Sequence, residues 1–290
     1  MKKKKICIVI GSAMNLNSLY KDQFKFLMEN GYEITGVAPA GIEHEWLRKD
    51  GVKTKIIHLK RPPSPLHDLF SLIQLTWFFI FNRFDIVSVS TPKASLIGAI
   101  AAVFTFQKNI FYTLRGRAYE MTTGRTRKFY EMVEKLVCKV SVKVFCISKE
   151  LRVDIIKKRL CDPKKIFVIG SGSSNGVDLK RFTPSAVNSE KGKKIRKKFN
   201  LRESDMLILY SGRIRKDKGV NELVIAFNSL SKKHSNIYLL IQGKYEVFNL
   251  LEENVLEVIK NHERIYEAGW EKNIENFYSA SDVFAFPSHR

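Results

Sequence analysis

The stretch from residue 206 to residue 230, MLILYSGRIRKDKGVNELVIAFNSL, joins an apolar run to an amphipathic one through a basic turn. Met206–Tyr210 is apolar at every position, as expected of a strand that helices cover on both faces of its sheet. Val220–Ser231 repeats apolar residues at helical spacing. The stretch therefore predicts a strand, a turn and a helix. The turn carries four cationic residues, Arg213, Arg215, Lys216 and Lys218.

The same alternation of short β-branched runs and helical patterns extends along the whole chain. The expected strands are Ile6–Ile10, Ile34–Val37, Lys55–Leu59, Ile86–Ser90, Ile110–Thr113, Val142–Ile147, Ile166–Ile169, Met206–Tyr210, Ile237–Ile241, Ile265–Glu267 and Val283–Phe286. The expected helices are Ser18–Asn30, Leu66–Phe81, Ala94–Phe106, Thr126–Val140, Lys149–Arg159, Lys191–Phe199, Val220–Ser231, Val247–Lys260 and Ile274–Ser279. Such alternation predicts the α/β class with parallel, doubly wound sheets.

The alternation is interrupted once, between Gly170 and Ser189, where Gly, Ser, Asn and Pro are frequent. A chain of 290 residues also suits two domains of ordinary size. We therefore predict two Rossmann-like domains, at residues 1–169 and 170–290. Val283–Phe286 is expected to be a buried strand, and residues 287–290 the start of the loop after it. In open α/β sheets, ligands bind beyond the carboxyl ends of the strands.

Composition narrows the class of protein. Hydrophobic residues make up 44% of the chain, which excludes a disordered protein. The 50 Lys and Arg residues against 29 Asp and Glu give a net charge of +21, which favours nucleic acid, an anionic membrane or phosphorylated substrates as partners. The four cysteines form no C-x-x-C pair, so a zinc ribbon is excluded. The longest apolar stretch, Leu66–Phe81, is too short and too polar to span a bilayer.

The basic turn is the segment that best fits phosphate chemistry. Arginine offers a fork to two phosphate oxygens, lysine adds a mobile point charge, and the N-terminus of the following helix favours anions. The chain has no D-x-D pair of the kind that holds a nucleotide diphosphate through a divalent cation. Arg213 and Lys218 are therefore candidates for neutralising a departing diphosphate. A solvated basic turn is the alternative.

Four segments together resemble a known family. SGRIRKDKGV (Ser211–Val220) resembles the GR-x(4)-KG segment of the retaining GT-B glycosyltransferases of family four. Ser90–Ala102, Tyr112–Glu120 and Gly170–Phe182 resemble the branch of that family that builds capsule, O-antigen and lipid-linked oligosaccharide. The resemblance runs from the first strand to Arg290.

The resemblance implies a hexosyl- or N-acetylhexosaminyltransferase of the GT-B fold. The donor would be a nucleotide sugar, usually linked to UDP, and the acceptor a lipid-linked glycan or a polysaccharide. Transfer would proceed with retention of configuration, without a metal ion or another cofactor. The protein would then be cytoplasmic, peripheral at the inner face of the cell membrane, with an anionic membrane surface and no nucleic acid among its partners.

The resemblance also assigns residues. Residues 1–169 would form the acceptor-side domain and residues 170–290 the nucleotide-sugar-binding domain. The residues that match donor-binding positions are Arg213, Lys218, Gly11, Ser12, Asn175 and Gly176. Arg115 stands where many relatives have a histidine in the acceptor-side catalytic loop. Glu120 could orient it through an ion pair, or be only a residue at the start of a helix. Lys93, close to a strand end, is a candidate for binding an acceptor phosphate.

One family feature is expected beyond the end of the chain. The glutamate pair that holds the donor sugar and ribose in these enzymes should follow Arg290, so we expect a C-terminally truncated second domain and a chain without transferase activity. A truncated, inactive relative is therefore one alternative. An NAD-dependent sugar-modifying enzyme is another, although Gly11-Ser-Ala-Met lacks its glycine fingerprint and Tyr130 is followed by Glu134 where a lysine is needed. A basic nucleic-acid-binding protein is suggested by charge alone.

Overall fold

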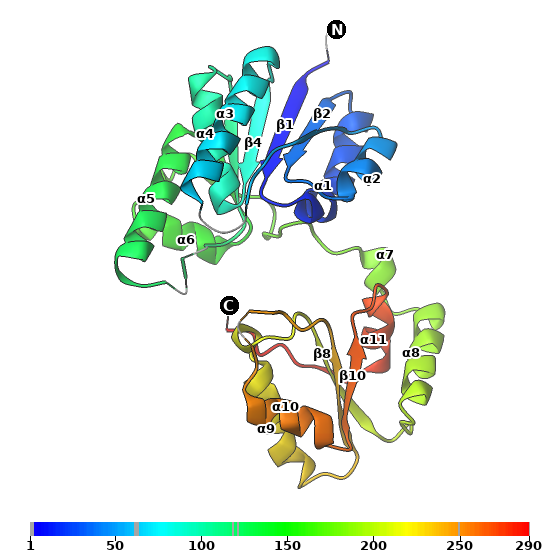
Figure 1. Ribbon diagram of the computed structural model, residues 1–290. Coiled ribbons are helices and arrows are strands. Elements are labelled where there is room, and N and C mark those ends of the chain that lie inside the picture. The colour runs from blue at the N-terminus through cyan, green and yellow to red at the C-terminus, as the bar shows by residue number, and fades with distance from the viewer. Residues whose placement is uncertain (1–2, 61–63, 118, 121, 249, 290) are drawn as a thin grey trace. The chain divides into compact units, whose positions relative to one another are not determined.

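The computed structural model describes residues 3–60, 64–117, 119–120, 122–248 and 250–289. Contacts divide the chain into two compact units, Met1–Gly176 and Val177–Arg290. Each unit contains a parallel β-sheet with helices packed against it (Figure 1). The turn at residues 170–176 belongs to the first unit, because the side chains of Arg115 and Asn175 tie it to the body of that unit.

The described residues of the first unit form a sheet of seven parallel strands. The strands are β1 (Lys5–Ile10), β2 (Glu33–Ala38), β3 (Lys53–Ile56), β4 (Ile86–Ser90), β5 (Ile110–Leu114), β6 (Lys143–Cys146) and β7 (Ile166–Val168). Their order is β3-β2-β1-β4-β5-β6-β7, so the direction of winding reverses between β1 and β4. Ligands of open α/β sheets bind at such a switch point, beyond the carboxyl ends of the strands.

Helices cover both faces of this sheet. They are α1 (Ala13–Glu29), α2 (Glu43–Lys49), α3 (Pro65–Phe81), α4 (Pro92–Phe104), α5 (Gly124–Val140) and α6 (Lys149–Lys157). Alternate side chains of β1 enter different cores: Ile8 packs with residues of α1 and α2, and Val9 with residues of α3 and α4. Figure 1 shows α1 and α2 on one side of the strands and α3 and α4 on the other. This two-sided burial explains why the strand sequences are apolar at consecutive positions.

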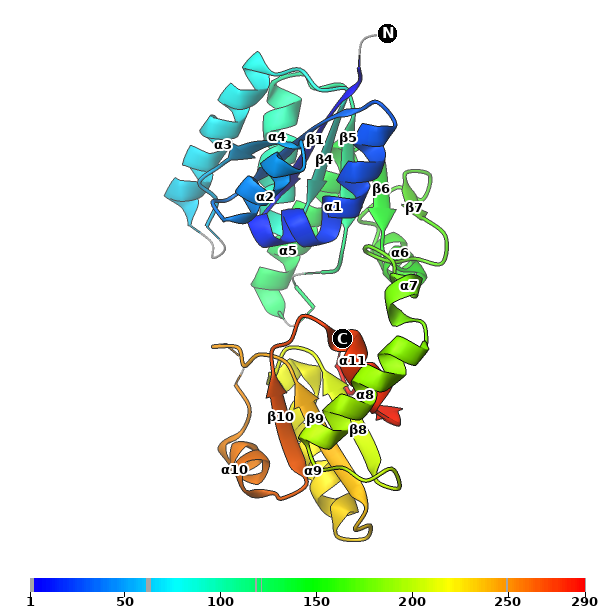
Figure 2. The same cartoon turned by 90° about the vertical axis from the view of Figure 1, so that its right-hand side faces the viewer.

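The second unit repeats this architecture on a smaller scale. Its described strands are β8 (Met206–Ser211), β9 (Ile237–Gln242), β10 (Ile265–Gly269) and β11 (Val283–Phe284), in the parallel order β10-β9-β8-β11. Its helices are α7 (Leu179–Phe182), α8 (Ala186–Lys198), α9 (Val220–Ser231), α10 (Glu253–Asn261) and α11 (Ile274–Ala280), with a 3₁₀ turn at Lys216–Lys218. α9 and α10 pack on one face of the sheet, and α8 and α11 on the other (Figure 2).

The predicted α/β class with parallel sheets is confirmed, but several boundaries differ. α1 begins at Ala13 and not at Ser18, because Ala13 and Leu16 continue the buried face of the helix. α10 begins at Glu253 and not at Val247, because the chain before it runs beside the loop after β8. α2, α7 and the 3₁₀ turn lie where no helix was predicted.

The prediction of a buried strand at Val283–Phe286 was wrong in part. β11 is a strand, but it covers Val283 and Phe284, which are 44% and 41% exposed. It pairs with β8 at the edge of the sheet, and its side chains are not buried on both faces although its sequence is apolar.

Candidate active site

The basic turn of the second unit lies at the carboxyl end of β8, as the sequence predicted. It runs beside the loop that follows β9: Gly212 N donates to Gln242 O at 3.0 Å, and Ile214 N to Lys244 O at 2.9 Å. The Ser211 hydroxyl donates to Gln242 Oε1 at 2.6 Å. Three hydrogen bonds therefore tie the turn to the loop after β9.

Gly243 makes this close packing of two loops possible. Its φ is +153°, and a Cβ atom at this position would lie 1.7 Å from Gly212 O. Gly243 N also donates to Gly269 O at 2.8 Å, so the ends of β8, β9 and β10 are joined.

The four cations of the turn differ in their partners. Arg215 Nε lies 2.5 Å from Oδ1 of the buried Asp217. Lys216 Nζ lies 2.8 Å from Glu252 Oε1. The Lys218 ammonium donates to Ser288 Oγ at 3.3 Å.

Arg213 is an exposed cation of the turn, and it forms no ion pair within the part of the chain that the structure describes. Its backbone is held by Tyr210, whose hydroxyl donates to Arg213 O at 2.7 Å. Burial, with the nearby Asp217 carboxylate, raises the pKa of Tyr210 to about 12, so this hydroxyl remains a donor at neutral pH. The backbone that carries the guanidinium group is thus held by a side chain of β8.

Residues 287–289 lie across the start of α9. A Cβ atom at Gly219, whose φ is +71°, would lie 2.1 Å from Pro287 O. His289 N donates to Asp217 O at 3.3 Å, and His289 Nε2 lies 3.0 Å from Glu222 Oε1. Ser288 and His289 were not predicted as site residues. Their position directly after the last strand was the signal that could have indicated them.

In the first unit, the switch point between β1 and β4 brings Gly11 and Thr91 together. Gly11 N donates to Thr91 Oγ1 at 3.0 Å. Thr91 has a φ of +69°, which is rare for a β-branched residue and is seen mainly at functional sites. Sequence reasoning missed Thr91, although a Thr-Pro pair at a strand end was a usable signal.

Arg115 connects the carboxyl ends of several strands. Its Nε donates to Ser90 Oγ at 3.2 Å, and its Nη1 donates to Ser174 O at 3.0 Å. Its guanidinium carbon lies 4.7 Å from the centre of the Tyr20 ring on α1. Arg115 therefore joins β4, α1 and the turn at residues 170–176, and its charge is directed into this edge of the first unit.

Ser12, Asn175 and Gly176 lie at the same edge. Ser12 is the N-cap of α1, its side chain makes no capping bond, and the first turn of α1 has no acidic residue. The free amide groups of that turn therefore favour an anion. Asn175 Nδ2 donates to Ser18 O at 3.3 Å, and Gly176 N to Ser173 Oγ at 2.8 Å.

The expectation that Glu120 pairs with Arg115 was wrong, because Glu120 forms its ion pair with Arg117. Arg117 Nε donates to Glu120 Oε1 at 3.0 Å, and Arg117 also pairs with Asp154 of α6. Burial alone would raise the pKa of Asp154, but hydrogen bonds from Lys158 and Arg117 hold it below its ordinary value. Glu120 thus anchors its loop to α6 through Arg117.

Lys93 is engaged by a carboxylate of the first unit. Its ammonium lies 2.8 Å from Asp68 Oδ1 on α3, and the side chain of each residue is about three-quarters buried (22% and 26% exposed). An acceptor phosphate at Lys93 would therefore meet a charge that is already balanced.

Sequence comparison places both units of this chain among glycosyltransferases. The family described as Glycosyltransferase Family 4 matches residues 21–181, and that described as Glycosyl transferases group 1 matches residues 191–290. The capsular polysaccharide biosynthesis glycosyltransferase CapM of Staphylococcus aureus is 31% identical over all 290 residues, which span 74% of that protein. The UDP-Gal:alpha-D-GlcNAc-diphosphoundecaprenol alpha-1,3-galactosyltransferase of Escherichia coli is 31% identical over 79% of this chain, which spans 58% of that enzyme.

A solved structure shares the fold. The crystal structure of Anabaena HepE in complex with UDP and glucose superposes with a TM-score of 0.70 at 15% identity, covering 99% of this chain and 74% of HepE. The Family 4 match covers more than half of the chain, and the Staphylococcus aureus relative aligns along all of it. The chain therefore belongs to the family-four glycosyltransferases of the GT-B fold.

Proposed function

We propose that this glycosyltransferase moves a hexosyl or N-acetylhexosaminyl unit from a UDP-linked donor to a lipid-linked or polysaccharide acceptor in bacterial surface glycan synthesis. The observation that carries the proposal is the basic turn after β8, where a hydrogen-bonded backbone carries Arg213, which has no ion-pair partner in the described part of the chain. Two similar proteins support it: HepE was crystallised with UDP, and the Escherichia coli relative is named for a UDP-galactose donor and a diphosphoundecaprenol acceptor.

The chemistry assigned to the turn is charge stabilisation. As the bond between the sugar and the diphosphate breaks, negative charge grows on the diphosphate oxygens, and fixed cations stabilise it more than they stabilise the bound donor. Arg213 and Lys218 supply this charge in the proposal, and the N-terminus of α9 adds its dipole. Transfer with retention and without a metal ion is part of the same proposal. Gly11, Ser12, Asn175 and Gly176 are assigned to the donor side.

The proposal is tested by titrating the protein with UDP and with UMP in a calorimeter. UDP is expected to bind at least about tenfold more tightly than UMP, because each hydrogen bond from a charged group to the second phosphate contributes about 1.5–3 kcal/mol. A chelator should leave the UDP affinity unchanged. Equal affinities for UDP and UMP would show that the turn does not recognise a diphosphate.

We further infer that the protein binds an anionic membrane surface through α3. Leu69, Ile73, Trp77 and Phe81 recur at helical spacing on its outer face and are 55%, 58%, 64% and 66% exposed. The opposite face, with Leu75 and Phe79 fully buried, packs into the core. In Figure 2, α3 runs along the outside of the first unit. An exposed apolar stripe of this length is typical of a helix that lies in a membrane interface.

Cations stand close to this stripe. Gln107 Nε2 donates to Phe79 O at 3.0 Å and to Asn82 O at 3.1 Å, so the ends of α3 and α4 lie side by side. The exposed Arg83 and Lys108 adjoin these ends, and Lys60 precedes α3. Within the described residues, no helix combines the length and apolarity that a bilayer span requires. The stripe and its cations together suit adsorption to anionic lipid.

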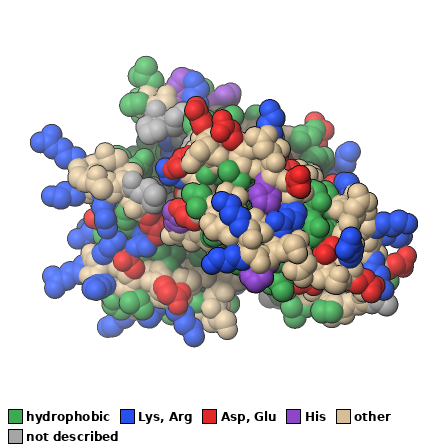
Figure 3. Space-filling view, turned by 90° about the horizontal axis from the view of Figure 1, so that it is seen from below, with side chains coloured by type: hydrophobic (Ala, Val, Ile, Leu, Met, Phe, Trp, Pro, Cys, Tyr) green, Lys and Arg blue, Asp and Glu red, His purple; other side chains and the backbone are tan. Residues whose placement is uncertain are grey.

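The remaining positive charge is distributed widely. On the face shown in Figure 3, Lys and Arg side chains stand among Asp and Glu side chains. Proteins that bind nucleic acid usually gather basic residues on one face. The net charge is therefore assigned to membrane and phosphate chemistry, and nucleic acid is not proposed as a partner.

The double replacement of Trp77 and Phe81 by serine is expected to weaken binding to anionic vesicles at least tenfold. Each such side chain contributes about 1.5–3 kcal/mol when it leaves water completely. Trp270→Ser is the matched control, because Trp270 is similarly exposed (70%) but lies in the second unit. Sedimentation with phosphatidylglycerol vesicles measures the effect, and added salt should weaken the wild-type binding. An equal loss in the control would show that α3 is not the membrane-binding element.

A further inference from the structure

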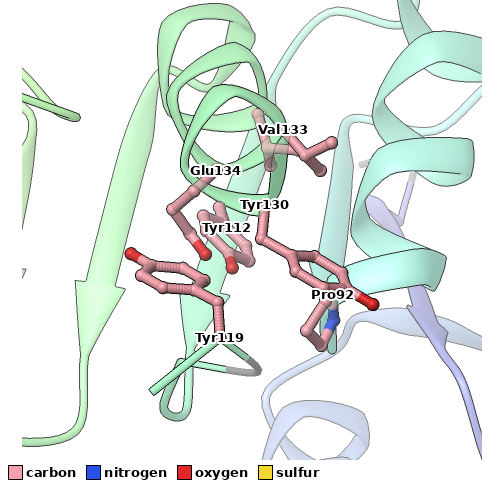
Figure 4. Close-up of a pocket in the computed structure, with 7 residues that line it drawn as sticks. Pro92, Tyr112, Tyr119, Tyr130, Val133 and Glu134 are labelled. Atoms are coloured by element: carbon pink, nitrogen blue, oxygen red, sulfur yellow. The ribbon is translucent and has the colours of Figure 1, made fainter. Parts of the chain in front are cut away.

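A small cavity lies beneath the residues that follow β5. Its volume is about 10 Å³, and it is lined by Tyr112 of β5, by Tyr119, and by Tyr130 and Glu134 of α5, with Pro92 at the start of α4. Glu134 is 5% exposed and Tyr119 is 2% exposed. In Figure 4 the Glu134 carboxyl group points towards the rings of Tyr112 and Tyr119. None of the assigned site residues lines this cavity.

Two polar atoms in this region have unused hydrogen-bonding capacity. Within the described part of the chain, Glu134 Oε1 and the Tyr119 hydroxyl are buried without a hydrogen-bond partner. A buried polar group left in this way costs about 1–3 kcal/mol. A cavity of this size holds about one water molecule, and a buried water needs two to four polar partners. The cavity therefore has the size and the lining of a site for a single water.

The protonation state of Glu134 follows from its surroundings. Burial raises the pKa of Glu134 to about 7, although hydrogen bonding by Tyr112 and the charge of Arg117 oppose this rise. Burial also raises the pKa values of Tyr112 and Tyr119, so both phenols stay protonated. Other titratable groups act on this cluster, and they are Glu131, Cys138, Cys146, Asp154 and Cys161. At neutral pH and below, Glu134 can thus serve as both a hydrogen-bond donor and an acceptor.

Tyr119 links the cavity to a network of charged side chains on its own loop and on α6. Its neighbour Glu120 pairs with Arg117, and Arg117 pairs with Asp154 of α6. Lys158 lies 3.0 Å from Asp154 Oδ2, and its ammonium lies 5.6 Å from the centre of the Tyr119 ring. The Tyr119 ring is therefore connected to Arg117 through Lys158 and Asp154, and to Glu120 as its neighbour in the chain.

We propose that Glu134 is a positioning residue that, in its protonated form, binds one water in this cavity and through it holds Tyr119, so that Arg117 and Glu120 keep their places. Loss of the proton would put an unpaired negative charge into a buried site and weaken this hold. The inference concerns residues beside Arg115, but it does not depend on the proposed function, because none of its readouts requires a nucleotide or an acceptor.

The pH dependence has a definite sign. The pKa of Glu134 is raised from its ordinary value of 4.5 to about 7 in the folded protein. The folded protein therefore binds more protons at this group than the unfolded chain does, and stability falls as pH rises. The stability that protonated Glu134 contributes to the folded protein is complete below about pH 4.5 and is lost as pH rises through about 7.

The test compares the wild type with Glu134→Gln, which keeps a neutral hydrogen-bonding group at every pH. Melting temperatures are measured from about pH 5 to about pH 8.5, and hydrogen exchange is followed in peptides that cover residues 115–120. The two proteins should melt alike at the acid end. At the alkaline end the wild type should melt several degrees lower, and its peptides should lose protection. Glu257→Gln, an exposed glutamate on α10, is the matched control and should follow the wild type.

Infrared spectroscopy provides a second readout. The wild type should show a protonated-carboxyl band that disappears with a midpoint near pH 7 and that Glu134→Gln lacks. Tyr119→Phe should lower the protection of residues 115–120 at the acid end, where the wild type keeps its hold on this side chain, because it removes one partner of the water. Absence of the band in the wild type near pH 6, or unchanged exchange in Tyr119→Phe, would overturn the proposal even if Glu134→Gln failed to fold.

Discussion

Replacing Arg213 with alanine is expected to weaken UDP binding by about tenfold to a hundredfold. A hydrogen bond to a charged group contributes about 1.5–3 kcal/mol, and each 1.4 kcal/mol corresponds to a factor of ten in affinity. Arg213 is exposed, and within the described residues no carboxylate competes for its guanidinium group. Its charge is therefore available to a phosphate without the loss of an existing ion pair. Calorimetric titration with UDP measures the effect.

Lys216→Ala is the matched control for this prediction. Lys216 carries the same charge in the same turn, but its ammonium is engaged by Glu252 at 2.8 Å. That carboxylate raises the pKa of Lys216. Removal of the Lys216 side chain should therefore change UDP affinity by less than about threefold, because Glu252 already balances its charge. If both variants bound UDP equally weakly, the turn would act through its total charge, and the specific role of Arg213 would be refuted.

Gly243→Ala is expected to destabilise the second unit severely. The added Cβ would lie 1.7 Å from Gly212 O, a backbone atom that cannot rotate away. A residue held in an unfavourable backbone conformation costs about 1–3 kcal/mol, and overpacking typically costs about as much again. These costs are large beside the total stability of about 5–15 kcal/mol of a typical protein. Melting of the purified variant, together with its soluble yield, tests the prediction.

Gly269→Ala separates the cost of the unfavourable backbone conformation from the cost of the steric clash. Gly269 also has a positive φ, +70°, but a Cβ there would meet no atom within 4 Å. This variant should therefore lose only the conformational part of the stability and should remain folded. A Gly243→Ala protein that melts no lower than Gly269→Ala would mean that the loops after β8 and β9 are not packed together as described. UDP binding should be lost with Gly243→Ala and retained with Gly269→Ala.

Parallel sheets covered by helices on both faces could be predicted from local sequence, but the order of the strands was not predicted. Ile6–Ile10 is apolar at consecutive positions, and Ile8 and Val9 do enter cores on opposite faces of the sheet. The same rule failed at Val283–Phe286, where an apolar run lies at a sheet edge and is exposed. An apolar run thus predicted a strand, but it did not predict which faces of that strand other elements cover.

By itself, the sequence determined the α/β class, the succession of most elements and the place of the basic turn after a strand. It did so because hydrophobic periodicity and turn residues act over a few neighbouring positions. The tertiary structure decided which partner each charged side chain meets. Lys216 meets Glu252, Lys218 meets Ser288, and Glu120 pairs with Arg117 and not with Arg115. Ion pairs and hydrogen bonds form over a few ångströms, and residues 36 or 70 positions apart reach that distance only after the sheet has placed their loops side by side.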